Sequence, residues 1–140
     1  MTYVPADLRR LVINRAGECC EYCRVHQSDS DVSFHAEHII AVSHGGKTSS
    51  ENLALSCPRC NSLKDSNIAA ADPKTDEPTF LFHPHRHQWN EHFRLEEAVI
   101  EPLTPEGRVT VFILRLNELD RLEQRELLIQ LKRYPCASSG

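Results

Sequence analysis

Aromatic residues are scarce in this sequence, which has one tryptophan, three tyrosines and five phenylalanines among its 140 residues. A chain of this length is expected to form one compact domain, or one small module with an added flank. Aromatic side chains bury large areas of apolar surface and dominate the energetics of many cores. Their scarcity therefore argues against a large hydrophobic core.

The chain also lacks an excess of positive charge, since 16 lysines and arginines face 20 aspartates and glutamates and the formal net charge is −4. This excludes a protein that coats nucleic acid through a globally basic surface. A nucleic-acid partner would have to be held by a local basic patch or through metal ions. The acidic excess lies entirely in residues 65–140, so DNA binding is expected on residues 1–64 and should be sensitive to salt.

No uncharged apolar run approaches the ~20 residues that a membrane-spanning helix needs. The stretch 109–114 stops after six residues, so no contact with membranes is expected. The first 15 residues contain no apolar segment of the kind found in signal peptides. We therefore expect a cytoplasmic protein, in which thiols stay reduced and clustered cysteines are interpreted as metal ligands before disulfides.

Cysteine and histidine are, in contrast, abundant, with six and eight copies. Four of the cysteines form two pairs in which two residues separate the members: Cys20, Cys23, Cys57 and Cys60. Two such pairs supply the four thiolates of a tetrahedral structural zinc site. Free buried thiols or a disulfide are the alternatives. Cys19 and Cys136 are left over; Cys19 could compete with Cys20, but only Cys20 has the two-residue spacing.

The pattern of apolar residues, prolines and glycines predicts the order of the elements. In the first half we expect a helix over 5–16, a strand over 32–38, a loop over 43–51, a strand over 53–56 and a helix over 58–66. In the second half we expect a linker or surface loop over 72–79, a strand over 93–102 and helices over 108–116 and 118–132. The segment 108–116 could also be a strand, because several of its residues are β-branched. The charged residues of the last helix are expected to face solvent.

The segment between and around the two cysteine pairs carries a resemblance to a known family. Its motifs are Glu37-His38-Ile39-Ile40, Ser43-His44-Gly45-Gly46, Glu51-Asn52-Leu53, Cys57-x-x-Cys60-Asn61 and Lys64. In this order they resemble the HNH endonucleases, whose core is the ββα-metal (His-Me finger) fold. The flanks resemble a bacterial subgroup with zinc knuckles, so the resemblance covers most of residues 5–125. It implies an α+β fold with an N-terminal helix and the HNH core over 1–68, and a mostly helical accessory region over 69–140.

The resemblance implies a metal-dependent enzyme that hydrolyses the phosphodiester bonds of DNA. It assigns His38 as the general base and Asn52 as the brace of the loop that orients it. Glu37 and Asn61 would ligate one catalytic cation, Mg²⁺ or Mn²⁺, which prefers oxygen ligands. An imidazole is a suitable base near neutral pH. Glu37 stands where aspartate is more usual and Asn61 where the family name expects a histidine, which bears on metal preference more than on activity.

Basic residues near this motif are candidates for contacts with phosphate groups. Arg59 and Lys64 lie on the helix that Pro58 begins, and they are our predicted phosphate contacts. The patch could extend to the first helix through Arg9, Arg10 and Arg15. For all of these residues, ordinary solvated charge is the alternative.

Other histidines have simpler interpretations. His35 could be a further contact at the site, or a partly exposed strand residue. The alternating His83, His85 and His87 lie in a proline-containing segment with no fixed convergence, so no second metal site is predicted there.

The rival function is a catalytically inactive zinc-binding module that binds nucleic acid or a protein partner. An RNA-directed nuclease is a third possibility, because the motif contacts phosphates and not bases. Double-stranded DNA is the expected partner. The sequence predicts neither the target sequence nor the oligomeric state.

Overall fold

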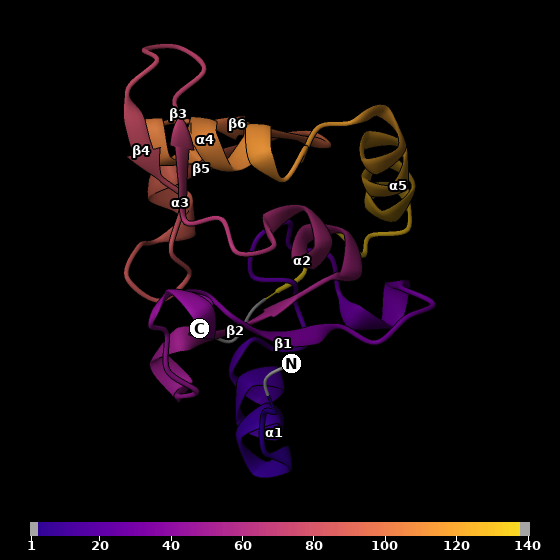
Figure 1. Ribbon diagram of the computed structural model, residues 1–140. Helices are drawn as coiled ribbons and strands as arrows, with labels where there is room; N and C mark the ends of the chain where they lie inside the picture. The colour runs from indigo at the N-terminus through magenta and orange to yellow at the C-terminus, as the bar shows by residue number, and fades with distance from the viewer. Residues whose placement is uncertain (1–2, 138–140) are drawn as a thin grey trace. The chain divides into compact units, whose positions relative to one another are not determined.

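A computed structural model of the protein describes residues 3–137 (Figure 1). The chain divides into two compact units. The first contains the chain up to Ser66 together with the residues from Pro135 onward, and the second is the intervening segment Asn67–Tyr134. The end of the accessory region predicted over 69–140 thus belongs to the first unit. That the two predicted regions are separate domains stays a prediction.

The first unit contains the predicted strand–strand–helix core. Its elements are α1 (Ala6–Arg15), β1 (His35–His38), β2 (Leu53–Ser56) and α2 (Pro58–Lys64), with 3₁₀ turns at Gln27–Asp29, Val42–His44 and Ser50–Asn52. β1 and β2 pair antiparallel, with His35 opposite Ser56 and His38 opposite Leu53. The predicted α+β fold class is confirmed. β1 begins three residues later than expected, because the amide of Phe34 donates to the Gln27 side chain (2.8 Å) instead of to a strand partner.

Packing and capping explain the position of these elements. All four residues of β2 are buried, because α1 packs against this strand while β1 pairs along its edge. α2 begins at Pro58, a residue whose missing N–H costs nothing in the first turn of a helix. The Sγ atom of Cys57 caps the helix by accepting from the amide of Cys60 at 3.4 Å. The second cysteine pair therefore forms the start of α2.

The second unit consists of two hairpins and three helices within the described residues. Its elements are β3 (Ala69–Ala71), β4 (Pro78–Phe80), α3 (Trp89–His92), β5 (Phe93–Glu96), β6 (Val99–Pro102), α4 (Pro105–Ile113) and α5 (Leu119–Gln130). β3 pairs with β4, and β5 pairs with β6. The ring of Phe93 packs against Trp89 and, edge-on, against Phe82, at centroid distances of 5.0 and 5.3 Å. This small aromatic cluster agrees with the low aromatic content.

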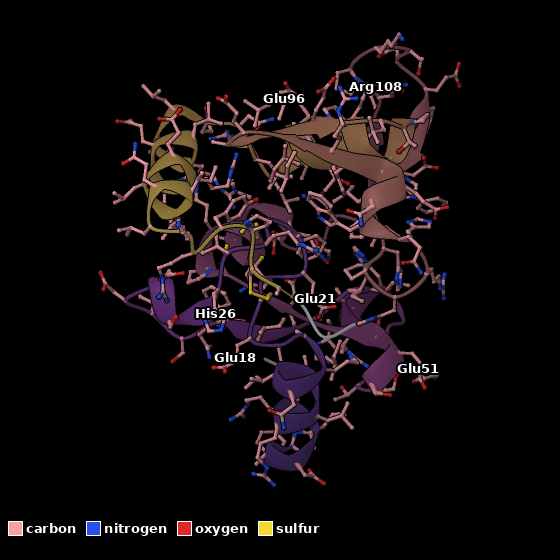
Figure 2. The ribbon with its side chains drawn as sticks, turned by 180° about the vertical axis from the view of Figure 1, so that it is seen from behind. Glu18, Glu21, His26, Glu51, Glu96 and Arg108 are labelled. Carbon is pink, nitrogen blue, oxygen red and sulfur yellow. A yellow bond between two sulfur atoms is a disulfide. The ribbon has the colours of Figure 1, made fainter. Side chains whose placement is uncertain are left out.

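The segment 72–79, predicted as a linker or surface loop, is the turn of the β3–β4 hairpin and the start of β4. The buried carboxylate of Asp72 organises the turn by accepting from the Lys74 amide and the Thr75 hydroxyl. Arg108, labelled in Figure 2, binds both carboxylate oxygens at 2.9 and 2.7 Å. These donors hold the pKa of Asp72 well below its usual range, the hydrogen bond from Arg108 having the largest effect.

The region after Trp89 departs from the prediction in two places. The strand expected over 93–102 is a hairpin, because Glu97 has a positive φ of 55° and reverses the chain. The ambiguous segment 108–116 is mostly helix, as predicted, and the Thr104 hydroxyl caps α4 by accepting from the Gly107 amide. In α5 the prediction that charged residues face solvent is wrong for Arg121 and Arg125. Both are buried, because their guanidinium groups donate to the carbonyls of Leu114 and Ala98.

The two leftover cysteines are joined, which contradicts the expectation that thiols stay reduced. Cys19 and Cys136 form a disulfide with Cα atoms 5.9 Å apart, a normal separation for such a bond (Figure 2). The amide of Cys136 also donates to the carbonyl of Arg24 at 2.9 Å. Residues 135–137 are thus attached to the loop that carries the first cysteine pair.

Candidate functional site

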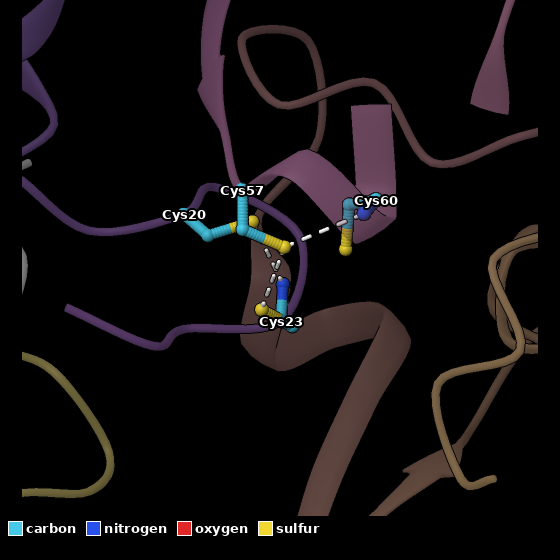
Figure 3. Close-up of side chains that lie close together, drawn as sticks. All are labelled: Cys20, Cys23, Cys57 and Cys60. Atoms are coloured by element: carbon cyan, nitrogen blue, oxygen red, sulfur yellow. Dashed lines mark hydrogen bonds between the residues drawn. The ribbon is translucent and has the colours of Figure 1, made fainter. Parts of the chain in front are cut away.

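The four cysteines of the predicted zinc site come together from two segments of the first unit (Figure 3). Their sulfur atoms all lie within 4.8 Å of one another, and all four residues are buried. The Sγ atoms of Cys23 and Cys57 are 3.8 Å apart. Zn–S bonds of about 2.3 Å in a tetrahedron require sulfur atoms about 3.8 Å apart. The donor set and its spacing therefore fit zinc.

The burial of the four cysteines also favours a bound cation, because buried thiolates need a compensating positive charge. Burial raises the pKa values of the Cys20 and Cys60 thiols well above the ordinary value. Four thiolates could share this volume only if a metal ion offset their charge. The backbone amides of Cys23 and Cys60 point at the sulfurs of Cys20 and Cys57, at 3.5 and 3.4 Å, and would stabilise them as ligands. The four cysteines are thus positioned to bind a metal ion.

A groove of about 780 Å³ lies in the first unit beside β1, the turn after it and the second half of α2. Below, "the groove" refers to this feature, which is lined by residues of 35–43 and 61–66. Among the residues that line it are Glu37, His38 and Asn61. The structure therefore brings together the predicted base and both predicted ligands of the catalytic cation. His35 and Asp65 line the same groove.

His38 is held by a hydrogen bond that the sequence did not indicate. Its Nε2 atom lies 2.9 Å from the hydroxyl oxygen of Thr48. Within residues 3–137 no protein group bonds to its Nδ1 atom. Partial burial lowers the pKa of His38 below its usual value, so the ring is neutral at neutral pH. The imidazole is thus oriented, uncharged and able to accept a proton.

Asn52 closes the loop between His38 and Thr48. Its side-chain oxygen accepts from the amide of Ile40 (3.0 Å), and its Nδ2 atom donates to the carbonyls of Ile40 (2.9 Å) and Lys47 (2.8 Å). The loop passes so close to Ile40 at Gly46 that a β-carbon there would collide with the Ile40 carbonyl. These contacts are those expected of a brace, and they explain why a glycine stands at position 46.

Glu37 is the most unusual group in the groove. It is 8% exposed, and its Oε1 atom has no hydrogen-bond partner among residues 3–137. Burial raises the pKa of this carboxyl to about 8, although Lys64 and the hydroxyls of Ser56 and Tyr22 favour the ionised form. A buried carboxylate oxygen without a partner costs free energy. A cation bound in the groove would remove this cost, so Glu37 fits the predicted role of ligand.

Glu37→Gln is expected to change how the stability of the protein depends on pH. Because the folded state raises this pKa from 4.5 to about 8, the contribution of Glu37 to stability is full below about pH 4.5 and is lost as the pH rises through about 8. The glutamine variant lacks this loss, so without added divalent cations it should become the more stable protein above pH 8, by a few kcal/mol at most. Thermal unfolding of the zinc-loaded proteins between pH 5 and 9 measures the difference. A stability difference that does not vary with pH would contradict the assignment.

The remaining predicted site residues lie as follows. Asn61 is half-buried on α2, and within residues 3–137 its side-chain amide has no protein partner, so it is available to a ligand. Arg59 is half-buried near the start of α2, and its contact with phosphate stays a prediction. The prediction for Lys64 is wrong. Its side chain is 1% exposed and its Nζ atom donates to the carbonyl of Ile39 at 2.7 Å.

The extension of the basic patch onto α1 stays a prediction, and two of its three arginines have hydrogen bonds within the fold. Arg15 donates to the carbonyls of Ser50 and Leu53, at 3.0 and 2.8 Å, and so connects α1 to β2. Arg9 donates to the Val4 carbonyl, and Arg10 is exposed. In the second unit, the Nδ1 atom of His83 accepts from backbone amides, which is a structural use.

The comparison with known proteins agrees with this geometry. Residues 20–67 match the family model described as HNH endonuclease. This segment is an HNH domain. The match begins at the first zinc-site cysteine and contains Glu37, His38, Asn52 and Asn61. The predicted family is therefore confirmed for this part of the chain, and nuclease activity is the general property of that family.

A curated relative extends the similarity beyond the HNH segment. The Septu protein PtuB of Bacillus thuringiensis is 23% identical over 127 residues, which is 89% of this chain and 47% of the relative. This chain thus spans about half of the length of that protein. No solved structure matches the chain. Between residues 3 and 137, no helix is both long enough and apolar enough to cross a membrane.

Proposed function

We propose that this protein is a metal-dependent endonuclease that hydrolyses the phosphodiester bonds of double-stranded DNA. The observation that supports this most is the groove itself, in which Glu37 and His38 of β1 meet Asn61 of α2. A neutral imidazole, a buried carboxyl with an unpartnered oxygen and an available amide are the groups that hydrolysis of a phosphodiester requires.

In the proposed reaction, His38 takes a proton from the attacking water. Its lowered pKa keeps the ring unprotonated at neutral pH. The hydrogen bond to Thr48 and the loop closed by Asn52 hold the ring in one orientation. The Nδ1 atom, which has no protein partner in the described chain, is the atom available to the water.

Glu37 and Asn61 would hold one divalent cation, Mg²⁺ or Mn²⁺, through the unpartnered Oε1 atom and the side-chain amide oxygen. When bound, the cation would stabilise the negative charge that develops on the phosphate and on the leaving 3′ oxygen. Arg59 would contact a phosphate group of the same backbone. The products would carry a 5′-phosphate and a 3′-hydroxyl.

Zinc at the four cysteines is the proposed structural cofactor. It would join the loop after α1 to the start of α2, and so support the helix that carries Asn61. A cytoplasmic place of action belongs to the same proposal, although disulfides such as Cys19–Cys136 are rare in cytosolic proteins.

Nicking of a supercoiled plasmid tests the proposal. The zinc-loaded protein should nick the plasmid when Mg²⁺ or Mn²⁺ is added and should be inactive in EDTA at a concentration that leaves the zinc bound. His38→Ala, purified in parallel, controls for a contaminating nuclease. Equal inactivity of both proteins with every metal would support the zinc-binding module instead. Cleavage of RNA but not of plasmid would correct the substrate.

A further inference from the structure

The backbone of the two residues that follow His38 is fully hydrogen-bonded. The Ile39 amide donates to the Asn52 carbonyl at 2.8 Å. The amide and the carbonyl of Ile40 bond to the side chain of Asn52, at 3.0 and 2.9 Å. The fourth group, the Ile39 carbonyl, accepts from the Nζ atom of Lys64 at 2.7 Å. Asn52 thus supplies three of the four partners, and Lys64 supplies the last one from a different element.

Burial of the Lys64 side chain has a high cost in free energy. This side chain is among the largest that are fully buried, at 1% exposure. Removing an ammonium group from water costs several kcal/mol unless opposite charge and hydrogen bonds offset the loss. The hydrogen bond to Ile39 offsets part of this cost, and the acidic groups of Glu37 and Asp65 act against the burial that lowers the pKa of Lys64. The buried ammonium group therefore has a hydrogen-bond acceptor and two acidic groups as neighbours.

The position of Lys64 links the two elements that carry the site. It lies on α2 one turn after Asn61, and its ammonium group reaches the end of β1, where Glu37 and His38 lie. Because the lysine is buried, it does not contact DNA. Of the groups around Glu37, it favours the ionised carboxylate most.

We propose that Lys64 is a positioning residue, which fixes the end of β1 against α2 by bonding the Ile39 carbonyl and so holds Glu37, His38 and Asn61 in one arrangement. This inference rests on the proposed nuclease function, and it assigns to Lys64 a role other than contact with phosphate. Misplacement of reacting groups by about 1 Å can cost a factor of about 100 in rate. Loss of the hydrogen bond between Lys64 and the Ile39 carbonyl should therefore lower the catalytic rate by a measurable factor.

The test compares Lys64→Met with Lys74→Met, an exposed lysine in the β3–β4 turn. Methionine has nearly the length of lysine but neither its charge nor its donor. In Lys64→Met we expect the zinc content of the wild type, a kcat for plasmid nicking that is lower by about 10- to 100-fold and a nearly unchanged KM for DNA. The affinity for Mn²⁺, measured by the EPR signal of the free ion, should fall about tenfold. Lys74→Met should match the wild type in each measurement.

A second variant covers the case in which Lys64→Met does not fold. Lys64→Gln keeps a donor on a shorter side chain, and should recover part of the kcat and of the Mn²⁺ affinity. Zinc loss and unfolding of both variants would assign Lys64 to the structure alone and would overturn the proposal. So would a lower melting temperature combined with the wild-type kcat and Mn²⁺ affinity per folded molecule. A wild-type protein that neither binds Mn²⁺ nor nicks DNA would instead refute the proposed function, and the positioning role with it.

Discussion

His38→Ala is expected to lower the rate of DNA nicking by a factor of about 10² to 10⁴, which is the usual contribution of a general base. The loss should appear in kcat, because the imidazole acts on the water and not on the binding of DNA. The wild-type rate should rise with pH and reach half of its plateau value below pH 6.5, since burial lowers the pKa of His38 from that ordinary value.

The structure offers a matched control for this variant. His44 is an exposed histidine in the turn Val42–His44, and within residues 3–137 its ring has no hydrogen-bond partner. His44→Ala removes an imidazole from the same unit and should retain the wild-type rate. Both variants should keep the zinc content and melting temperature of the wild type, because neither ring is buried in the core. A folded His38→Ala protein with wild-type activity would show that another group is the base.

Cys57→Ser is expected to remove the zinc and the folded state together. Binding of structural zinc to small domains is worth about 10–16 kcal/mol at neutral pH, and this binding energy is folding energy. Cys57 has a second task, because its sulfur caps α2 by accepting from the Cys60 amide. Its loss therefore acts on the helix that carries Asn61 as well as on the metal.

Zinc content by elemental analysis, together with thermal unfolding, measures the effect. Cys136→Ser provides the matched control, since it removes a cysteine outside the cluster. The Cys136→Ser substitution breaks the disulfide that joins Cys136 to Cys19, 117 residues earlier in the chain. Loss of a native disulfide typically costs about 2–5 kcal/mol, and the variant should retain its zinc. A Cys57→Ser protein that stays soluble and unfolds at the wild-type temperature would refute the zinc site.

The parts of the fold that were predicted correctly depend on short-range patterns. The two-residue spacing of each cysteine pair is a property of one turn of chain, so it indicates a zinc knuckle without knowledge of the rest. Pro58 and Thr104 are similar signals, because a proline in the first turn and a hydroxyl at the cap act within a few residues. The order of motifs around Glu37 and Asn61 was sufficient to predict the family.

Three of the predictions that failed concern charged residues whose partners lie elsewhere in the chain. Lys64 was expected to contact phosphate, and Arg121 and Arg125 were expected to face solvent. Each instead donates to a backbone carbonyl that lies 7 to 27 residues away. A charged side chain looks the same in a sequence whether it is solvated or paired. Only packing decides which carbonyls are left without a partner and which cation can reach them.

The amino-acid order was thus sufficient to predict the family and the four clustered cysteines, because each belongs to a local motif of a known kind. The general base and the ligands of a catalytic cation stay predictions. The folded chain added what no local pattern contains: the hydrogen bond between Thr48 and His38, the disulfide between Cys19 and Cys136, and the buried Lys64 that donates to the Ile39 carbonyl. These features depend on which segments meet in space, and that depends on the burial of apolar surface over the whole unit and not on neighbouring residues.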